Sequence, residues 1–124
     1  MQGLKKYKID YSGEALYVEN IKWNDKGLVV ELENDNCEII KLVFENTVYL
    51  YINTAESYKP KFWIENPEDY YPFLYLEDSK KICELKKEAK HIENKKIIHF
   101  AIVGVDNIVE VFTSDFPRVH LKQK

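Results

Sequence analysis

The sequence predicts an α+β protein in which a single antiparallel β-sheet, a meander of about six to eight strands, carries one amphipathic helix on one face. Three observations lead to this prediction. Short apolar segments are separated by turn residues, a helical spacing of apolar residues occurs at about 79–92, and the most apolar stretch, 97–112, divides into two strands at Asp106 and Asn107. Because 124 residues, 45% of them hydrophobic, suffice for one core, residues 1–124 are expected to form a single domain.

The first half of the chain is predicted to form successive strands joined by tight turns. Strand composition begins at residues 15–23, and residues 24–27, Asn-Asp-Lys-Gly, suit a type I turn whose glycine takes a positive φ. Residues 28–33 alternate between apolar and polar side chains, and 37–45 and 48–52 follow as further strands. The side chains predicted to face the core are Leu28, Val30, Leu32, Ile40, Leu42 and Phe44. Consecutive strands joined by short turns favour an antiparallel meander.

Residues 97–112 are expected to form the central hairpin of the sheet. A two-residue turn at Asp106 and Asn107 would place Ile102 opposite Val111. One face of the hairpin would then carry Phe100, Ile102, Val109, Val111 and Thr113. The other face would carry His99, Ala101, Val103, Val105, Ile108, Glu110 and Phe112. One apolar and one mixed face are typical of central strands that a helix covers on one side.

The helix is predicted to begin at Asp78 or Ser79, since either side chain can accept a hydrogen bond from the free amides of the first turn. Its apolar stripe comprises Ile82, Leu85, Ala89 and Ile92. A short strand at 73–77 precedes the helix, and the segment containing Val119 and Leu121 could add an edge strand.

Charge and motif patterns argue against several classes of function. The net charge is −3, and the 18 basic and 21 acidic residues are intermixed, so no broad basic surface is expected for nucleic acid or for an anionic membrane. The first ten residues lack the apolar segment of a signal peptide and no run suits a membrane span, which predicts a cytoplasmic protein. No phosphate-binding loop, metal-ligand spacing or nucleophile motif occurs, so the sequence predicts neither an enzyme nor a bound cofactor or metal. Cys37 and Cys83 are expected to be reduced, buried thiols.

A polar site around His99 is the alternative hypothesis. A histidine inside a core strand needs a hydrogen-bond partner or contact with water. The alternative function is a small-molecule-binding or hydrolytic domain that uses His99 with nearby carboxylates, Glu56 among them. In the predicted register His99 faces Ser114, and Glu110 lies several pairs away along the hairpin. A structural histidine bonded to a neighbouring carboxylate or carbonyl is therefore the simpler interpretation.

The aromatic residues suggest a function most directly. Tyrosine and tryptophan dominate binding surfaces because their rigid rings bury a large area at small entropic cost, and the chain has nine Tyr and two Trp. Tyr49 and Tyr51 are predicted to share an outward face, with the irregular stretch 54–72 behind them. The predicted binding residues are Tyr49, Tyr51, Tyr58, Trp63, Tyr70 and Tyr71. They favour a non-enzymatic module that binds a protein partner or a second copy of itself, unless the stretch 54–72 folds back over that face and completes a second small core.

Several short motifs spread over residues 39–121 resemble a group of small, leaderless proteins of Bacillus-like bacteria that have no assigned function. These motifs are Phe44-Glu45-Asn46-x-x-Tyr49-x-Tyr51, Asn53-x-x-Glu56-Ser57-Tyr58, Glu77-Asp78-Ser79, His99-Phe100-x-Ile102, Asp106-Asn107-x-Val109-Glu110-Val111 and Phe116-Pro117-x-Val119. The chain has Asn53 and a lysine-rich 80–90 segment where such relatives often carry an arginine and a tryptophan-rich helix. The resemblance implies the fold more than an activity. By analogy with other small acidic α+β proteins, it also implies an immunity-type inhibitor that neutralises a toxin.

Overall fold

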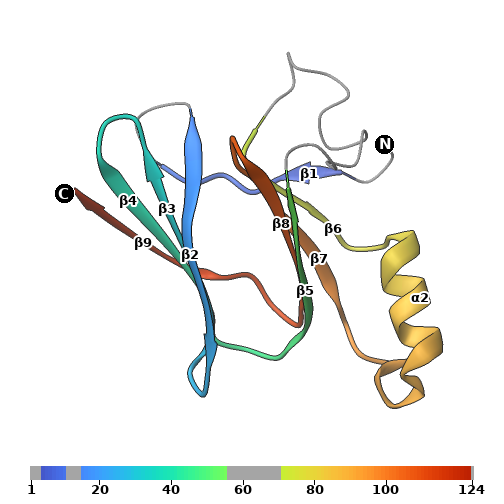
Figure 1. The fold of residues 1–124 in the computed structure, drawn as a ribbon. Helices are drawn as coiled ribbons and strands as arrows, with labels where there is room; N and C mark the ends of the chain where they lie inside the picture. The colour runs from blue at the N-terminus through green and yellow to red at the C-terminus, as the bar shows by residue number, and fades with distance from the viewer. Residues whose placement is uncertain (1–3, 11–14, 56–70, 124) are drawn as a thin grey trace.

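Two antiparallel β-sheets, rather than the predicted single sheet, make up the fold (Figure 1). The computed structural model describes residues 4–10, 15–55 and 71–123. The five-stranded sheet has the order β1 (Lys5–Lys6), β6 (Phe73–Leu76), β7 (Ile98–Val103), β8 (Asn107–Thr113) and β5 (Val48–Ala55). The four-stranded sheet has the order β2 (Leu16–Asn24), β3 (Gly27–Asn34), β4 (Glu38–Phe44) and β9 (Arg118–Gln123). Among the described residues there is one α-helix, α2 (Lys80–Glu88), followed by the short 3₁₀ helix η3 (Lys90–Ile92).

The predicted meander is correct for β2, β3 and β4 and wrong at β5. After β4 the chain crosses to the other sheet, where β5 pairs with β8, and the C-terminal strand β9 takes the position beside β4. The prediction followed local turn signals, which favour pairing between consecutive strands. The apolar face of β2 to β4 needs a second apolar layer, and one nine-residue helix cannot cover a single sheet of this size. A second sheet supplies that layer.

The turn between β2 and β3 forms as predicted and requires its glycine. Gly27 has φ +120°, and the Asn24 side chain accepts a hydrogen bond from the Lys26 amide at 2.8 Å. A Cβ atom at Gly27 would lie 2.1 Å from the carbonyl oxygen of Phe44 on β4. Position 27 therefore requires glycine for two reasons, the positive φ and the close approach of β4.

The main core lies between the two sheets. The four-stranded sheet contributes Leu16, Leu28, Val30, Leu32, Ile40, Leu42 and Phe44, which include all the inward residues predicted for β3 and β4. The five-stranded sheet contributes Phe73, Ile98, Phe100, Ile102, Val109 and Val111. The rings of Phe44 and Phe100 meet edge to face across the core with centroids 5.6 Å apart. The apolar face of the β7–β8 hairpin thus packs against the β2–β4 meander.

The β7–β8 hairpin is central in its sheet, as predicted, but its register differs by two residues. Ile102 pairs with Val109 rather than Val111, and His99 pairs with Phe112 rather than Ser114. The loop spans Gly104 to Asp106, and the Gly104 amide donates to the Asn107 carbonyl at 2.9 Å. A shift of two residues preserves the faces, so the predicted division into an inner and an outer set is correct.

Helix α2 covers the outer face of the five-stranded sheet near its β7 and β8 strands. Ser79 caps it, as its Oγ accepts the Ile82 amide at 3.1 Å. Ile82 and Ile92 pack with Ile97 and Phe112, and Leu85 and Ala89 extend the contact, so the predicted apolar stripe is confirmed. The predicted burial of the cysteines is wrong. Cys37 and Cys83 are free and exposed, because Cys37 lies in the β3–β4 turn and Cys83 on the outer side of α2.

Candidate functional site

A buried polar cluster joins the first turn of α2 to the centre of the five-stranded sheet. His99 Nε2 lies 2.8 Å from Glu110 Oε1, and His99 Nδ1 lies 3.0 Å from Ser79 Oγ. Lys81 Nζ approaches the second Glu110 oxygen at 3.4 Å. His99 and Glu110 are next to each other because the observed register places Glu110 opposite Ala101, one diagonal step from His99 on the same face. The predicted register had separated them, so the sequence reasoning missed this pair.

Glu110 is held as a carboxylate. Burial by itself would raise its pKa, but the hydrogen bond from His99 and the positive charge of Lys81 outweigh burial and hold the pKa below the ordinary value of 4.5. An ionised carboxylate only accepts hydrogen bonds, so His99 Nε2 carries the proton. In the neutral ring, Nδ1 then accepts the Ser79 hydroxyl proton while Ser79 Oγ accepts the Ile82 amide.

Serine, histidine and a carboxylate in this order are also the groups of a serine hydrolase. In such an enzyme the serine oxygen must face substrate. Here Ser79 Oγ is engaged as the cap of α2, and His99 and Glu110 are 1% and 0% exposed. Four pockets along the described residues lie elsewhere and contain none of the three. The contacts of this cluster fasten the start of the helix to the sheet.

The prediction that Tyr49 and Tyr51 share an outward face is wrong, because the two side chains pack on opposite sides of the five-stranded sheet. An irregularity between Val48 and Leu50 makes Tyr49 an extra residue in the β5 ladder. Tyr49 packs against the cluster beneath α2, while Tyr51 packs against the core between the sheets. The bulge that separates them has no signal in the sequence.

The remaining predicted binding residues fall into two groups. Tyr71 is half-buried, and its hydroxyl accepts the Ile9 amide at 3.0 Å, so it ties the N-terminal segment to the sheet. Tyr58, Trp63 and Tyr70 lie outside the described residues, as does Glu56 of the predicted polar site.

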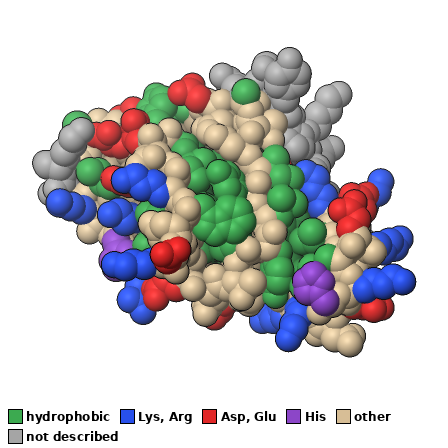
Figure 2. Space-filling view, turned by 60° about the horizontal axis from the view of Figure 1, so that its bottom comes forward, with side chains coloured by type: hydrophobic (Ala, Val, Ile, Leu, Met, Phe, Trp, Pro, Cys, Tyr) green, Lys and Arg blue, Asp and Glu red, His purple; other side chains and the backbone are tan. Residues whose placement is uncertain are grey.

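An exposed apolar surface adjoins the edge of β5 that pairs with no other strand among the described residues, and Tyr51 is the residue of it that the sequence predicted. Trp23, at the end of β2, is 51% exposed and meets the Tyr51 ring edge to face, with centroids 5.4 Å apart. Leu50 is 39% exposed and pairs with Phe112, which places it on the outer face of the sheet. Figure 2 shows this end of the molecule, where a strip of backbone and other side chains separates two groups of hydrophobic side chains. We call Trp23, Leu50, Tyr51 and the outer edge of β5 the β5 edge surface.

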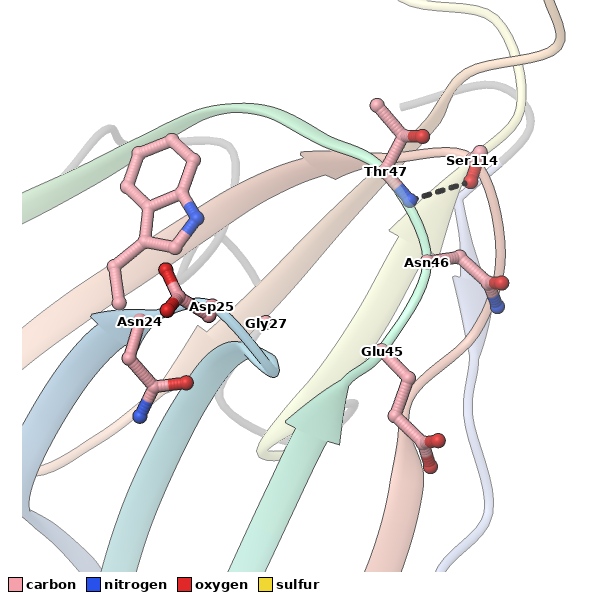
Figure 3. Close-up of a pocket in the computed structure, with 8 residues that line it drawn as sticks. Asn24, Asp25, Gly27, Glu45, Asn46, Thr47 and Ser114 are labelled. Atoms are coloured by element: carbon pink, nitrogen blue, oxygen red, sulfur yellow. Dashed lines mark hydrogen bonds between the residues drawn. The ribbon is translucent and has the colours of Figure 1, made fainter.

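A shallow polar pocket of about 460 Å³ adjoins Trp23 (Figure 3). The β2–β3 turn forms one side, and the segment between β4 and β5 forms the other. Ser114, after β8, accepts the Thr47 amide at 3.1 Å and fixes the second side. Its lining residues are Trp23, Asn24, Asp25, Gly27, Glu45, Asn46, Thr47 and Ser114. The indole of Trp23 is the apolar part of an otherwise polar rim.

The described residues also bear on metal binding and on membrane insertion. They contain no group of three or more His, Cys, Asp or Glu side chains that could hold a metal ion. In the same part of the chain, no helix is both long and apolar enough to span a membrane.

Comparison of the chain with protein-family models, with curated proteins and with solved structures found no match in any of the three. The resemblance to small Bacillus-type proteins therefore stays a prediction. Function has to be argued from the geometry of this chain.

Proposed function

We propose that this protein is a non-enzymatic protein-binding module and that the β5 edge surface is its binding site. The observation that carries the proposal is an uncharged edge strand with an exposed apolar side chain, Leu50, on its outer face and the exposed indole of Trp23, from β2, beside its inner face. Tyr51 and Trp23 lie on the inner side of the edge, and Leu50 lies on the outer side. A strand added beside β5 would contact both groups while its backbone pairs with β5.

The other sheet edges in the described residues carry features that oppose pairing. β9 contains Arg118, His120 and Lys122, and β1 has two residues, both lysines. β2 contains Glu19 and Lys22, and its register is interrupted at Glu19. Charges, shortness and bulges are the devices by which proteins protect a sheet edge. β5 has the sequence VYLYINTA without a charge, and its one irregularity, at Tyr49, lies near its start, so its ladder is regular from Leu50 to Ala55. An edge without charges that is unpaired among the described residues favours the binding of a partner strand.

Two further points support this class of function. The Ser79, His99 and Glu110 side chains satisfy one another, and the histidine and glutamate are buried, so their geometry suits a structural role better than catalysis. The resemblance found in the sequence adds, by analogy, the immunity-type inhibitor, which is itself a protein-binding function.

Site-specific photo-crosslinking in the native cells tests the proposal. A benzophenone amino acid at position 50 is expected to form an adduct with a protein, because Leu50 is an exposed residue of the edge strand β5. The matched control is position 121, where Leu121 is 48% exposed on the charged edge strand β9. An adduct from position 50 and none from position 121 would support the proposal. No adduct from position 50, or equal adducts from both positions, would contradict it.

A further inference from the structure

We propose that the strand bound at β5 is the β5 strand of a second copy of this chain, paired antiparallel about a two-fold axis. This inference rests on the proposed function and names its partner. The two five-stranded sheets would then run on as one sheet across the dimer. Such an isologous interface uses the same patch on both subunits.

The absence of charge on β5 favours a second copy over a different protein. In an antiparallel pair about a two-fold axis, each residue lies opposite or near its own copy at the centre of the interface. A lysine or glutamate there would face a like charge, which destabilises a strand pair. VYLYINTA contains no charged residue, so self-pairing of this strand brings no like charges together. Recognition of a different, charged partner would instead use complementary charges along the edge.

The side chains around β5 also suit a symmetric pair. From Leu50 to Ala55 the strand is regular, and it carries Leu50 and Ile52 on the outer face and Tyr51 and Asn53 on the inner face. Pairing would cover the exposed Leu50 of each copy with apolar side chains of the other strand. It would also bring a second apolar strand toward the indole of Trp23, which is half-exposed in the single chain.

Sedimentation velocity of the purified full chain over a wide range of concentration tests the inference. The wild type is expected to sediment as a dimer that dissociates on dilution. Leu50→Lys is expected to weaken the dimer by about a hundredfold or more, because it places a charge among the apolar side chains that pairing would bury. Leu121→Lys, a lysine at a similarly exposed leucine on β9, is expected to leave the dimer unchanged.

A second measurement keeps the inference testable if Leu50→Lys fails to fold. Benzophenone placed at position 50 of the purified protein is expected to yield a cross-linked dimer in which both peptides contain residues from 48–55. A wild type that stays monomeric at every concentration, or a cross-link to another part of the second copy, would overturn the self-pairing. If that monomer still gives an adduct from position 50 with another protein in cells, the proposed function stands and only the identity of the partner is wrong.

Discussion

Replacing Glu110 by alanine is expected to lower the free energy of unfolding by about 3–5 kcal/mol, because it removes the charged acceptor of a buried hydrogen bond and leaves a cavity beside His99. His99 would keep a buried ring N–H without its acceptor, 1% exposed and enclosed by Phe112 and the start of α2. The loss of the Lys81 ion pair would cost less free energy, because the Lys81 side chain is 42% exposed and water can solvate it. Glu110→Gln keeps an oxygen that can accept from His99, so a smaller loss of about 1–3 kcal/mol is expected.

The pH dependence of stability tests whether the Glu110 side chain is ionised in the folded protein. Because the pKa of Glu110 is lower in the folded protein than the ordinary value of 4.5, the unfolded chain takes up the proton first as the pH falls. The stability that Glu110 contributes is therefore complete above about pH 4.5 and is lost as the pH falls through the folded-state pKa. Urea denaturation should show that the difference in free energy of unfolding between wild type and Glu110→Gln becomes smaller in this acid range. Glu45→Gln, at an exposed pair with Arg118, should change stability by less than about 1 kcal/mol. An equal difference in free energy of unfolding between the two proteins at every pH would contradict the assignment of Glu110 as a carboxylate.

Replacing Phe100 by alanine is expected to lower the free energy of unfolding by about 3–5 kcal/mol, the cost of truncating a fully buried aromatic side chain. Phe100 is 0% exposed and joins the two sheets through its contact with Phe44. The Tyr7 ring also packs against it, with ring centroids 5.3 Å apart. The two sheets cannot collapse onto a cavity there without moving several strands.

Phe100→Leu is the matched variant, because it keeps most of the volume and should cost clearly less than the alanine variant. Chemical denaturation of both proteins gives the comparison. A loss below about 1 kcal/mol for Phe100→Ala would mean that this ring does not lie at the centre of the core.

The sequence predicts those parts of this fold that depend on local patterns. The alternation of β3, the glycine of the β2–β3 turn and the Ser79 cap of α2 each depend on a few adjacent residues, and all three are observed. Side chains of the β7–β8 hairpin alternate between its two faces, so an error of two residues in register leaves the predicted faces correct.

The parts that could not be predicted depend on contacts between distant segments. Nothing near β5 in the sequence indicates that it pairs with β8 rather than with β4, because that choice depends on how two apolar faces cover each other. The hydrogen bond between His99 and Glu110 depends on the observed register of the β7–β8 hairpin. The prediction assumed a two-residue turn at Asp106 and Asn107, which shifts the register by two residues. Trp23 was read only as part of a strand, and its contact with Tyr51 requires that the edges of two sheets meet. The absence of charge in residues 48–55 was the one sequence signal that could have identified the β5 edge surface.

Amide hydrogen exchange along β5 tests the central claim, an open edge at β5, most directly. The measurement is best made by NMR on dilute Leu50→Lys protein, in which association is expected to be weakest. An open edge predicts alternation from Leu50 to Ala55, with slow exchange for amides that face β8 and fast exchange for those that point away from it. Uniformly slow exchange along β5 in that protein would contradict an open edge, because β5 would then be covered within the single chain.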